Sequence, residues 1–294
     1  MGAYRLDPTL PVDAEVRRVA RAQLDRAIQE LDLTDRHEAA HEVRKRCKKL
    51  RGLIRLVRGT AGTVHQEENP ALRDTARRLA GDRDLAASVE ALDELDAAAS
   101  VDLDESDVEV VRAGLIEERD RDVEPWDQQR TVVLAELQAV QERVTGWVLP
   151  GVGFEVLAGG LHRTYRRACK RMVDAAEVGT PEALHEWRKR VKYHWYHLQL
   201  LRNAWPPVLR AQARQVHELS ELLGHERDLT LLLGRLHTSP DSYGGAAVVA
   251  RIGVAVEQRR GELRAAAFPL GQRCFAERPR DLVNRIEGYW QTAT

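Results

Sequence analysis

The sequence predicts an all-α protein built from two similar halves. Residues that favour helices dominate its 294 positions, and apolar residues recur every three or four positions instead of alternating. No alternating β-branched run of strand length stands out. A basic segment that begins at His41 returns 144 positions later at His185, so the helical pattern occurs twice.

Polar caps and Gly or Pro breakers delimit six helices in the first half. Asp13 caps the first of them, and Thr34 or Asp35 caps the second, which is the basic one. Pro125 marks the boundary before the last. The expected helices are about 13–31, about 35–58, one that follows Asn69-Pro70, one that begins after Gly81-Asp82, about 104–118 and about 126–148.

The run Leu149-Pro150-Gly151-Val152-Gly153 interrupts the helical pattern near the middle of the chain, and after it the pattern restarts. Thr180 caps the second basic helix, with Pro181 at its first position. Gly224 is expected to separate two later helices, and the segment 239–245 is expected to be a loop. The expected helices are about 154–176, from Thr180 to the stop at 203–207, from there to Leu223, one after Gly224, and the last ones between about 246 and 290.

A second pair of motifs shares the offset of the two basic segments. Arg83-Asp84-Leu85 recurs as Arg227-Asp228-Leu229, again 144 positions later, and with a slip of one residue Arg18 and Arg21 match Arg163 and Arg166. Because two anchors share one offset, we expect a single domain over residues 1–294, with a repeat of 1–148 and 154–294 joined by a linker near 149–153. The two halves are expected to pack about a pseudo-twofold axis.

The charges are segregated along the chain, although the net charge is only −1. Residues 36–58 hold nine Lys or Arg against two Glu, whereas residues 92–124 hold thirteen Asp or Glu against three Arg. No apolar run approaches the roughly 18 residues of a membrane-spanning helix, and the N-terminus lacks the apolar stretch of a secretion signal, so we expect a cytoplasmic protein without membrane partners. The three cysteines form no Cys-x-x-Cys pair and are expected to face the core.

Each basic helix is expected to carry one cationic face. At about 100° per residue, one side of the first copy holds His41, Arg44, Lys45, Lys48 and Arg55, opposite Val43, Leu50, Leu53, Ile54 and Val57. In the second copy the polar side holds His185, Arg188, Lys192 and Tyr196, opposite Trp187, Val191, Leu198 and Leu201. Two interpretations of these faces are open. In the first, each face is a solvated surface or pairs with acidic residues such as those of 92–124. In the second, the two faces border one channel and form a polyanion site.

In a polyanion site, Lys and Arg would pair with phosphates, Arg through two parallel hydrogen bonds. His41 and His185 would donate to phosphate oxygens and bind better when protonated. The second interpretation therefore predicts tighter binding towards about pH 6.

Three sets of motifs make the chain resemble the CHAD family, the conserved histidine α-helical domain. They are the doubled His-x-x-Arg-x-x-x-Lys pattern, the doubled Arg-Asp-Leu that follows a Gly-containing turn, and Gly160-Leu161-His162-Arg163-Thr164-Tyr165-Arg166-Arg167. The resemblance extends over nearly the whole chain, to Tyr289-Trp290. It implies an all-helical, pseudo-symmetric domain whose basic central pore binds inorganic polyphosphate, often in association with polyphosphate granules.

Carried over by position, the resemblance implies a set of ligand contacts on the basic helices and their neighbours. Trp195 stands where the family tends to have Arg, so the pore is expected to be less charged or differently shaped there. Arg83 and Arg227 either reach phosphate or pair with Asp84 and Asp228 to hold the bundle, and we favour the structural role. The expected polyphosphate-binding residues are Arg18, Arg21, His41, Arg44, Lys48, Lys49, Arg51, Arg55, Arg163, Arg166, His185, Arg188, Lys192 and Tyr193.

The leading hypothesis is a non-enzymatic polyphosphate-binding protein that needs no metal or cofactor. His37-Glu38-Ala39-Ala40-His41 formally matches a zinc motif, but no third ligand is evident and the neighbouring cations disfavour a divalent ion. The expected pore holds almost no carboxylate to bind the magnesium that phosphoryl transfer uses. Two alternatives stay open. One is an RNA binder that stacks bases on Tyr193, Trp195 or Tyr196, and the other is a scaffold or an enzyme that acts on polyphosphate.

Overall fold

The computed structural model describes residues 4–79, 81–121 and 126–293, without the side chains of 81–84 and 121. Eleven α-helices and no β-strand occur in these ranges, so the predicted all-α class is confirmed. The helices are α1 (Val12–Glu30), α2 (Arg36–Leu56), α3 (Gly62–Arg78), α4 (Gly81–Asp96), α5 (Glu105–Arg121), α6 (Trp126–Val144), α7 (Glu155–Val178), α8 (Pro181–Leu201), α9 (Pro206–Thr238), α10 (Ala246–Cys274) and α11 (Pro279–Thr292), with a 3₁₀ helix, η1 (Pro240–Tyr243), before α10.

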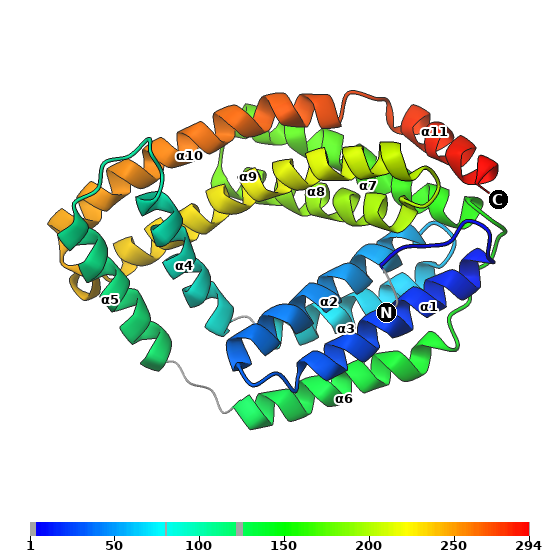
Figure 1. The fold of residues 1–294 in the computed structure, drawn as a ribbon, viewed down its shortest axis with the longest axis horizontal. Helices are drawn as coiled ribbons and strands as arrows, with labels where there is room; N and C mark the ends of the chain where they lie inside the picture. Colours follow the sequence, from blue (N-terminus) through cyan, green and yellow to red (C-terminus); the bar gives the residue numbers. More distant parts are fainter. Residues whose placement is uncertain (1–3, 80, 122–125, 294) are drawn as a thin grey trace.

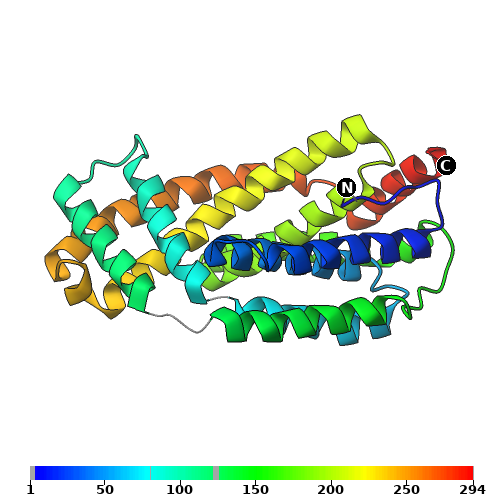
Figure 2. The same cartoon turned by 60° about the horizontal axis from the view of Figure 1, so that its bottom comes forward.

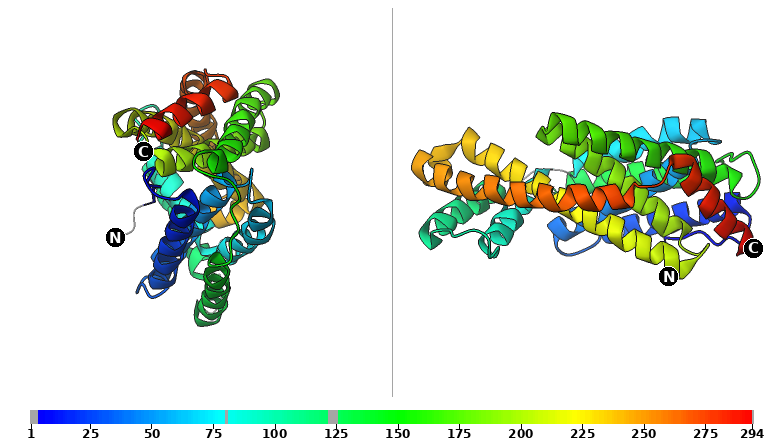
Figure 3. Two further views of the ribbon diagram at one scale, coloured as in Figure 1. Left: turned by 90° about the vertical axis from the view of Figure 1, so that its right-hand side faces the viewer. Right: turned by 90° about the horizontal axis from the view of Figure 1, so that it is seen from above.

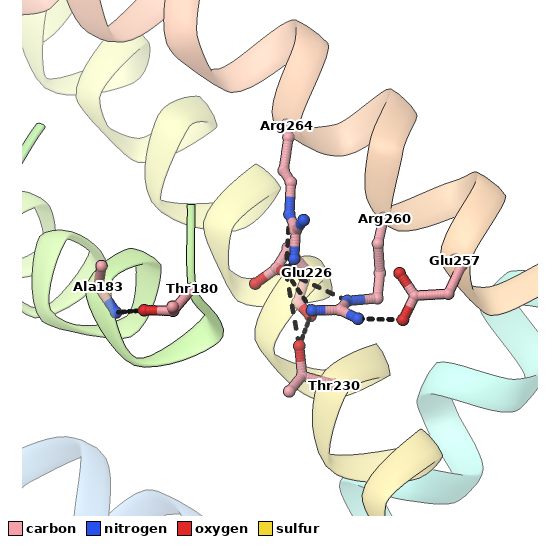
Figure 4. Close-up of polar contacts among 7 residues, drawn as sticks. All are labelled: Thr180, Ala183, Glu226, Thr230, Glu257, Arg260 and Arg264. Carbon is pink, nitrogen blue, oxygen red and sulfur yellow. Dashed lines mark hydrogen bonds and ion pairs between the residues drawn. The ribbon is translucent and has the colours of Figure 1, made fainter. Parts of the chain in front are cut away.

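Both basic helices begin with the side-chain caps that the sequence predicts. The carboxylate of Asp35 accepts from the backbone N–H of His37 at 2.8 Å, at the start of α2. At the start of α8, the hydroxyl of Thr180 accepts from the N–H of Ala183 at 3.3 Å, with Pro181 in the first position (Figure 4). These caps satisfy backbone donors that have no partner inside the helix.

Two predicted helix breaks are wrong. Pro70 lies inside α3, which continues because Leu72 on one side of it and Glu68 on the other are fully buried. Tertiary packing therefore outweighs the cost of about 3 kcal/mol that an interior proline imposes. Gly224 lies inside α9 and is buried, and a Cβ atom there would meet the Arg188 guanidinium at 3.1 Å. The glycine thus gives room to a neighbouring side chain and does not end the helix.

The helices form two adjoining bundles that share one hydrophobic core. In Figure 1, α1, α2, α3 and α6 lie together, and α7, α8 and α11 lie with parts of α9 and α10 on the other side. The view along the long axis in Figure 3 shows these bundles stacked on each other. The predicted apolar faces of α2 and α8 supply this core: Val43, Leu50, Leu53, Ile54, Val57, Trp187, Val191, Leu198 and Leu201 are all buried.

A second, smaller core lies at the far end of α9 and α10, where α4 and α5 pack across them (Figure 2). Leu92 of α4, Val111 of α5, Leu232 of α9 and Ile252 of α10 are fully buried in it. The acidic stretch 92–124 therefore belongs largely to this end of the molecule. Its carboxylates bind cations there: Asp107 pairs with Arg251 at 2.6 Å, and Glu118 pairs with Arg235.

A buried ion network joins α9 to α10 (Figure 4). One oxygen of Glu226, whose side chain is 2% exposed, accepts hydrogen bonds from Arg260 at 3.0 Å and Arg264 at 2.6 Å. Arg260, itself 7% exposed, also pairs with Glu257. Burying these charges is tolerable only because each has a partner.

The first residues of two helices are separated by the same 144 positions as the repeated motifs. Helix α3 begins at Gly62 and α9 at Pro206, 144 positions later. In the second half, the single helix α9 takes the place of both α3 and α4. None of the helices in the described ranges combines the length and the apolar character that crossing a membrane requires.

Candidate anion-binding site

Glycines bring the end of α2 against α7. A Cβ atom on Gly160 would lie 1.9 Å from the carbonyl oxygen of Leu56, and one on Gly59 would lie 3.0 Å from the Cα atom of Gly159. Only glycine permits the approach at Gly160, because the obstacle is backbone and not a flexible side chain. The contact places Arg58, just beyond the end of α2, close to α7.

Replacing Gly160 by alanine is expected to lower the free energy of unfolding by about 1–3 kcal/mol, because the added methyl group overpacks the contact between α2 and α7. Denaturant unfolding measures the change. Gly234→Ala is the control: no atom lies within 4 Å of a Cβ atom at that helical position, so the substitution should be neutral or stabilise by up to about 1 kcal/mol. Equal effects of the two substitutions would contradict the role given to Gly160.

The helices α2 and α8 meet at positions that correspond in the repeat. A Cβ atom on Gly52 would lie 2.9 Å from that of Tyr196, which is 144 positions later, and His197 Nε2 donates to the Gly52 carbonyl oxygen at 3.1 Å. The two basic helices therefore touch at positions that correspond in the repeat. The assignment of Tyr196 to the cationic face was wrong, because packing against Gly52 and Tyr4 buries its ring.

Six arginines gather at this junction, and we call them the arginine cluster. Arg51 and Arg55 both donate to the side-chain oxygen of Asn69 on α3, Arg51 from Nε at 3.1 Å. The guanidinium carbon of Arg55 also lies 4.1 Å from the centre of the Tyr193 ring. The cluster consists of Arg51, Arg55 and Arg58 from α2 and its end, Arg163 and Arg167 of α7, and Arg190 of α8.

The cations of the cluster repel one another. Burial first, and then the charges of Arg163 and Arg190, lower the pKa of Arg58. Burial lowers the pKa of Arg55 to about 10, with Tyr193 opposing the shift and neighbouring arginines adding to it. Within the described residues, no carboxylate forms an ion pair with Arg51, Arg55, Arg58, Arg163 or Arg167, and Arg190 has one contact with Glu186 at 3.5 Å. The cluster therefore carries positive charge that an anion can neutralise.

His65 of α3 belongs to the same site and was missed from the sequence. Burial first, and then the charges of Arg58, Arg55, Arg163 and Arg51, lower the pKa of His65 to about 4. Its Nε2 atom is buried without a hydrogen-bond partner. No sequence signal identified it, because it lies outside the repeated motifs and the position 144 residues later is a leucine. The expected contacts also omitted three arginines of the cluster, Arg58, Arg167 and Arg190. Arg167 ends the motif that begins at Gly160, and the other two lie in the repeated basic segments.

The predicted residues in the first half of α2 lie before the cluster on the same helix. His41 and Lys48 are exposed, and Nε2 of His41 is 3.9 Å from the carboxylate of Glu42. Arg44 donates to the carbonyl oxygen of Leu79, at the end of α3, at 2.9 Å. Arg44 thus satisfies a carbonyl group at a helix C-terminus.

The matching residues of α8 are more buried. Burial first, and then the charges of Arg227, Lys189 and Arg188, lower the pKa of His185 to about 4. At this pKa His185 is mostly neutral near pH 6, so the stronger binding expected of its protonated form requires a phosphate to raise its pKa. Arg227 acts electrostatically on His185, whereas the side chains of Arg83 and Asp84 lie outside the described residues.

Lys192 connects the two cationic faces. Burial lowers its pKa, Glu221 at 3.4 Å opposes the shift, and Arg188 and Lys45 of α2 add to it. Its ammonium group lies 4.6 Å from the Trp195 ring, which stacks on His217 with ring centres 4.4 Å apart. Lys45 of α2 thus acts electrostatically on Lys192 of α8, which lies beside Trp195.

The structure does not bring all the predicted residues together. Arg18 is bound by the buried carboxylate of Glu15 at 2.6 Å and donates to the Arg5 carbonyl oxygen at 2.8 Å. Lys49 lies 5.5 Å from the Tyr4 ring, and burial with nearby cations lowers its pKa to about 8. Arg21 and Arg166 are exposed, and Arg166 acts electrostatically on Arg167.

A cavity of about 280 Å³ lies elsewhere, between α8, α9 and the α10–α11 region. It is lined in part by His194, Gln212 and Arg273 and shares no residue with the arginine cluster. In the described part of the chain there is no group of three or more His, Cys, Asp or Glu that could hold a metal ion. The arginine cluster and the two cationic faces are therefore the candidate site, since they concentrate positive charge, although Glu42 and Glu221 pair with Lys45 and Lys192 on the faces.

Comparison with protein-family models matches residues 16–237 to the CHAD domain. The match contains both basic helices, the α2–α7 contact and the whole arginine cluster. No curated protein matches the chain.

Proposed function

The chain belongs to the CHAD domain family, and from this membership and its arginine cluster we propose that it binds inorganic polyphosphate without acting on it. The observation that carries the proposal is a set of five clustered arginines that form no ion pair with a carboxylate of the described residues, although Asp74 interacts with Arg51 at longer range. Like charges held together are unfavourable, and a ligand with closely spaced negative charges relieves the repulsion. Guanidinium groups suit this ligand because each binds two phosphate oxygens at once.

We place the ligand in a central pore between α2 and α8. Two observations support this proposal: Lys45 acts electrostatically on Lys192, and Gly52 packs against its counterpart Tyr196, so the two basic helices are neighbours. A linear polyanion laid along this path meets the lysines and then the arginine cluster. A continuous path of cations favours a chain of phosphates over one compact anion.

RNA is the second candidate, and the aromatic residues argue against it. A base-stacking site needs ring faces that are open to a base. The Tyr193 face holds Arg55, the Trp195 ring stacks on His217, and Tyr196 is buried. Without base stacking, the site would attract RNA only through its phosphates. Polyphosphate carries more phosphates per unit length than RNA.

The proposal is of binding and not of catalysis. The side chains of the cluster are cations, which attract phosphate but repel the magnesium ions that phosphoryl transfer normally uses. Association with polyphosphate granules belongs to the proposal as a consequence of binding long chains.

A competition titration tests the function. Labelled long-chain polyphosphate is bound to the protein, and unlabelled polyphosphate or single-stranded RNA is added at equal phosphate concentration. Polyphosphate should displace the label and RNA should not. Displacement by RNA to the same extent would contradict the proposal, and release of orthophosphate in the presence of magnesium would contradict the absence of catalysis.

Binding is expected to tighten as the pH falls towards about 4, the pKa of His65 in the free protein. His65 has a pKa of about 4 in the free protein, and a bound phosphate raises that pKa, so binding takes up a proton. The affinity should therefore rise on acidification, by at most about tenfold per pH unit. Titrations of wild type and His65→Gln with one polyphosphate measure the effect. The same pH dependence in both proteins would show that His65 is not the group that protonates.

A further inference from the structure

The arginine cluster has a counterpart region in the other half of the chain, and the two differ in charge. We call the cluster with His65 the first arm of the site, and the positions 144 or 145 residues away the second arm. Most positions of the second arm lie on α8 and α1, the repeat counterparts of α2 and α7, but α1 does not pack on α8 as α7 packs on α2. Its residues, in the order that matches Arg51, Arg55, Arg58, His65, Arg163, Arg167 and Arg190, are Trp195, Gln199, Arg202, Leu209, Arg18, Ala22 and Arg46.

Four of these seven positions have lost their basic side chain. Trp195 and Gln199 replace arginines on the basic helix, and Ala22 replaces Arg167. Leu209 replaces His65 and is fully buried in the main core, so this position does not face a ligand.

Two of the three remaining arginines are held by carboxylates. The buried Glu15 binds Arg18 at 2.6 Å. Glu30 binds Arg46 at 2.5 Å, and Glu42 adds a contact at 3.3 Å. At the edge of this arm, Glu221 also pairs with Lys192. Only Arg202 resembles its counterpart, Arg58. Burial and the charges of Arg5 and Arg210 lower the pKa of Arg202.

We infer that polyphosphate binds to the first arm and hardly to the second. A short chain, or one stretch of a long chain, is then enough to fill the first arm. This inference rests on the proposed function. Electrostatic attraction in solution fades over about 8–10 Å, so phosphates that extend towards the second arm gain little. With one phosphate for each cation of the cluster, a stretch of roughly six phosphates saturates the site.

The two arms supply a matched pair of variants. Arg58 follows the end of α2 and Arg202 caps the end of α8, and they are 144 positions apart. Arg58→Glu is expected to weaken binding of polyphosphate by about 30-fold or more, and Arg202→Glu by less than about threefold. Circular dichroism verifies that each variant is folded. If Arg58→Glu does not fold, Arg167→Ala at an exposed position makes the same test, with an expected loss of about tenfold.

Chain length gives a second readout with the wild-type protein. Linear polyphosphates of roughly six and roughly one hundred phosphates are compared at equal phosphate concentration, and their affinities should agree within about threefold. A second working arm would instead tighten the long chain by about 100-fold or more, because its binding would be intramolecular. Equal effects of Arg58→Glu and Arg202→Glu, or a large gain with length, would overturn the one-sided site while polyphosphate binding stands. Failure of both polyphosphates to bind wild type would overturn the proposed function itself.

Discussion

Replacing Arg163 and Arg167 together by glutamate is expected to weaken polyphosphate binding by about 100-fold or more. The two residues are exposed on α7, one turn apart, so the change leaves the core intact. Each lost hydrogen bond between a guanidinium and a phosphate costs about 1.5–3 kcal/mol, and the new carboxylates also repel the ligand. Isothermal titration of both proteins with the same polyphosphate measures the loss.

The matched control is Arg73→Glu with Arg77→Glu on α3. These arginines are also exposed and four positions apart, but they pair with Asp74 and do not belong to the cluster. Their reversal makes the same change in net charge, so it measures the effect of overall charge alone. If the control weakened binding as much as the α7 variant, the attraction would come from net charge and not from the arginine cluster.

Removing the carboxylate of Glu226 is expected to lower the free energy of unfolding by about 3–5 kcal/mol. Glu226→Gln keeps an acceptor oxygen but removes the negative charge that Arg260 and Arg264 share, and Arg260 is almost fully buried. Buried cations that lose their buried counter-ion are costly, because they have given up hydration that a neutral amide does not replace. Denaturant unfolding near pH 7 measures the change.

Glu257→Gln is the control for this prediction. Glu257 contacts the same Arg260, but its side chain is 55% exposed, so its loss should cost less than about 1 kcal/mol. Similar losses for both substitutions would mean that Glu226 does not act as a buried counter-ion. Polyphosphate binding should survive in the folded fraction of either variant, since this network is separate from the arginine cluster.

Local features of the fold could be predicted from the sequence because they depend on neighbours in the chain. The caps Asp35 and Thr180 and the buried faces of both basic helices follow from side-chain chemistry and the helical period. The interior positions of Pro70 and Gly224 could not be predicted, since packing across helices decides whether a breaker is overruled. The same limit applies to Tyr196, whose burial depends on Gly52 of another helix.

The sequence predicted a site with two equivalent cationic faces. In the structure, the two repeat-related parts of the site differ in charge. The repeat directed attention to α2 and α8, and it predicted the same ligand-binding role for Arg18 as for Arg163. Only the three-dimensional arrangement shows that Glu15 holds Arg18. His65 was missed because its surroundings come from α2 and α7, which are distant from it in the sequence or belong to the other half.

The most direct test of the central claim is a crystal structure of the protein with a linear polyphosphate of about six phosphates. We expect phosphate groups within hydrogen-bond distance of Arg58, Arg163 and Arg167, with His65 facing the ligand. Phosphates bound instead on a surface away from the junction of α2, α7 and α8, such as that around Arg73 and Arg77, would contradict it.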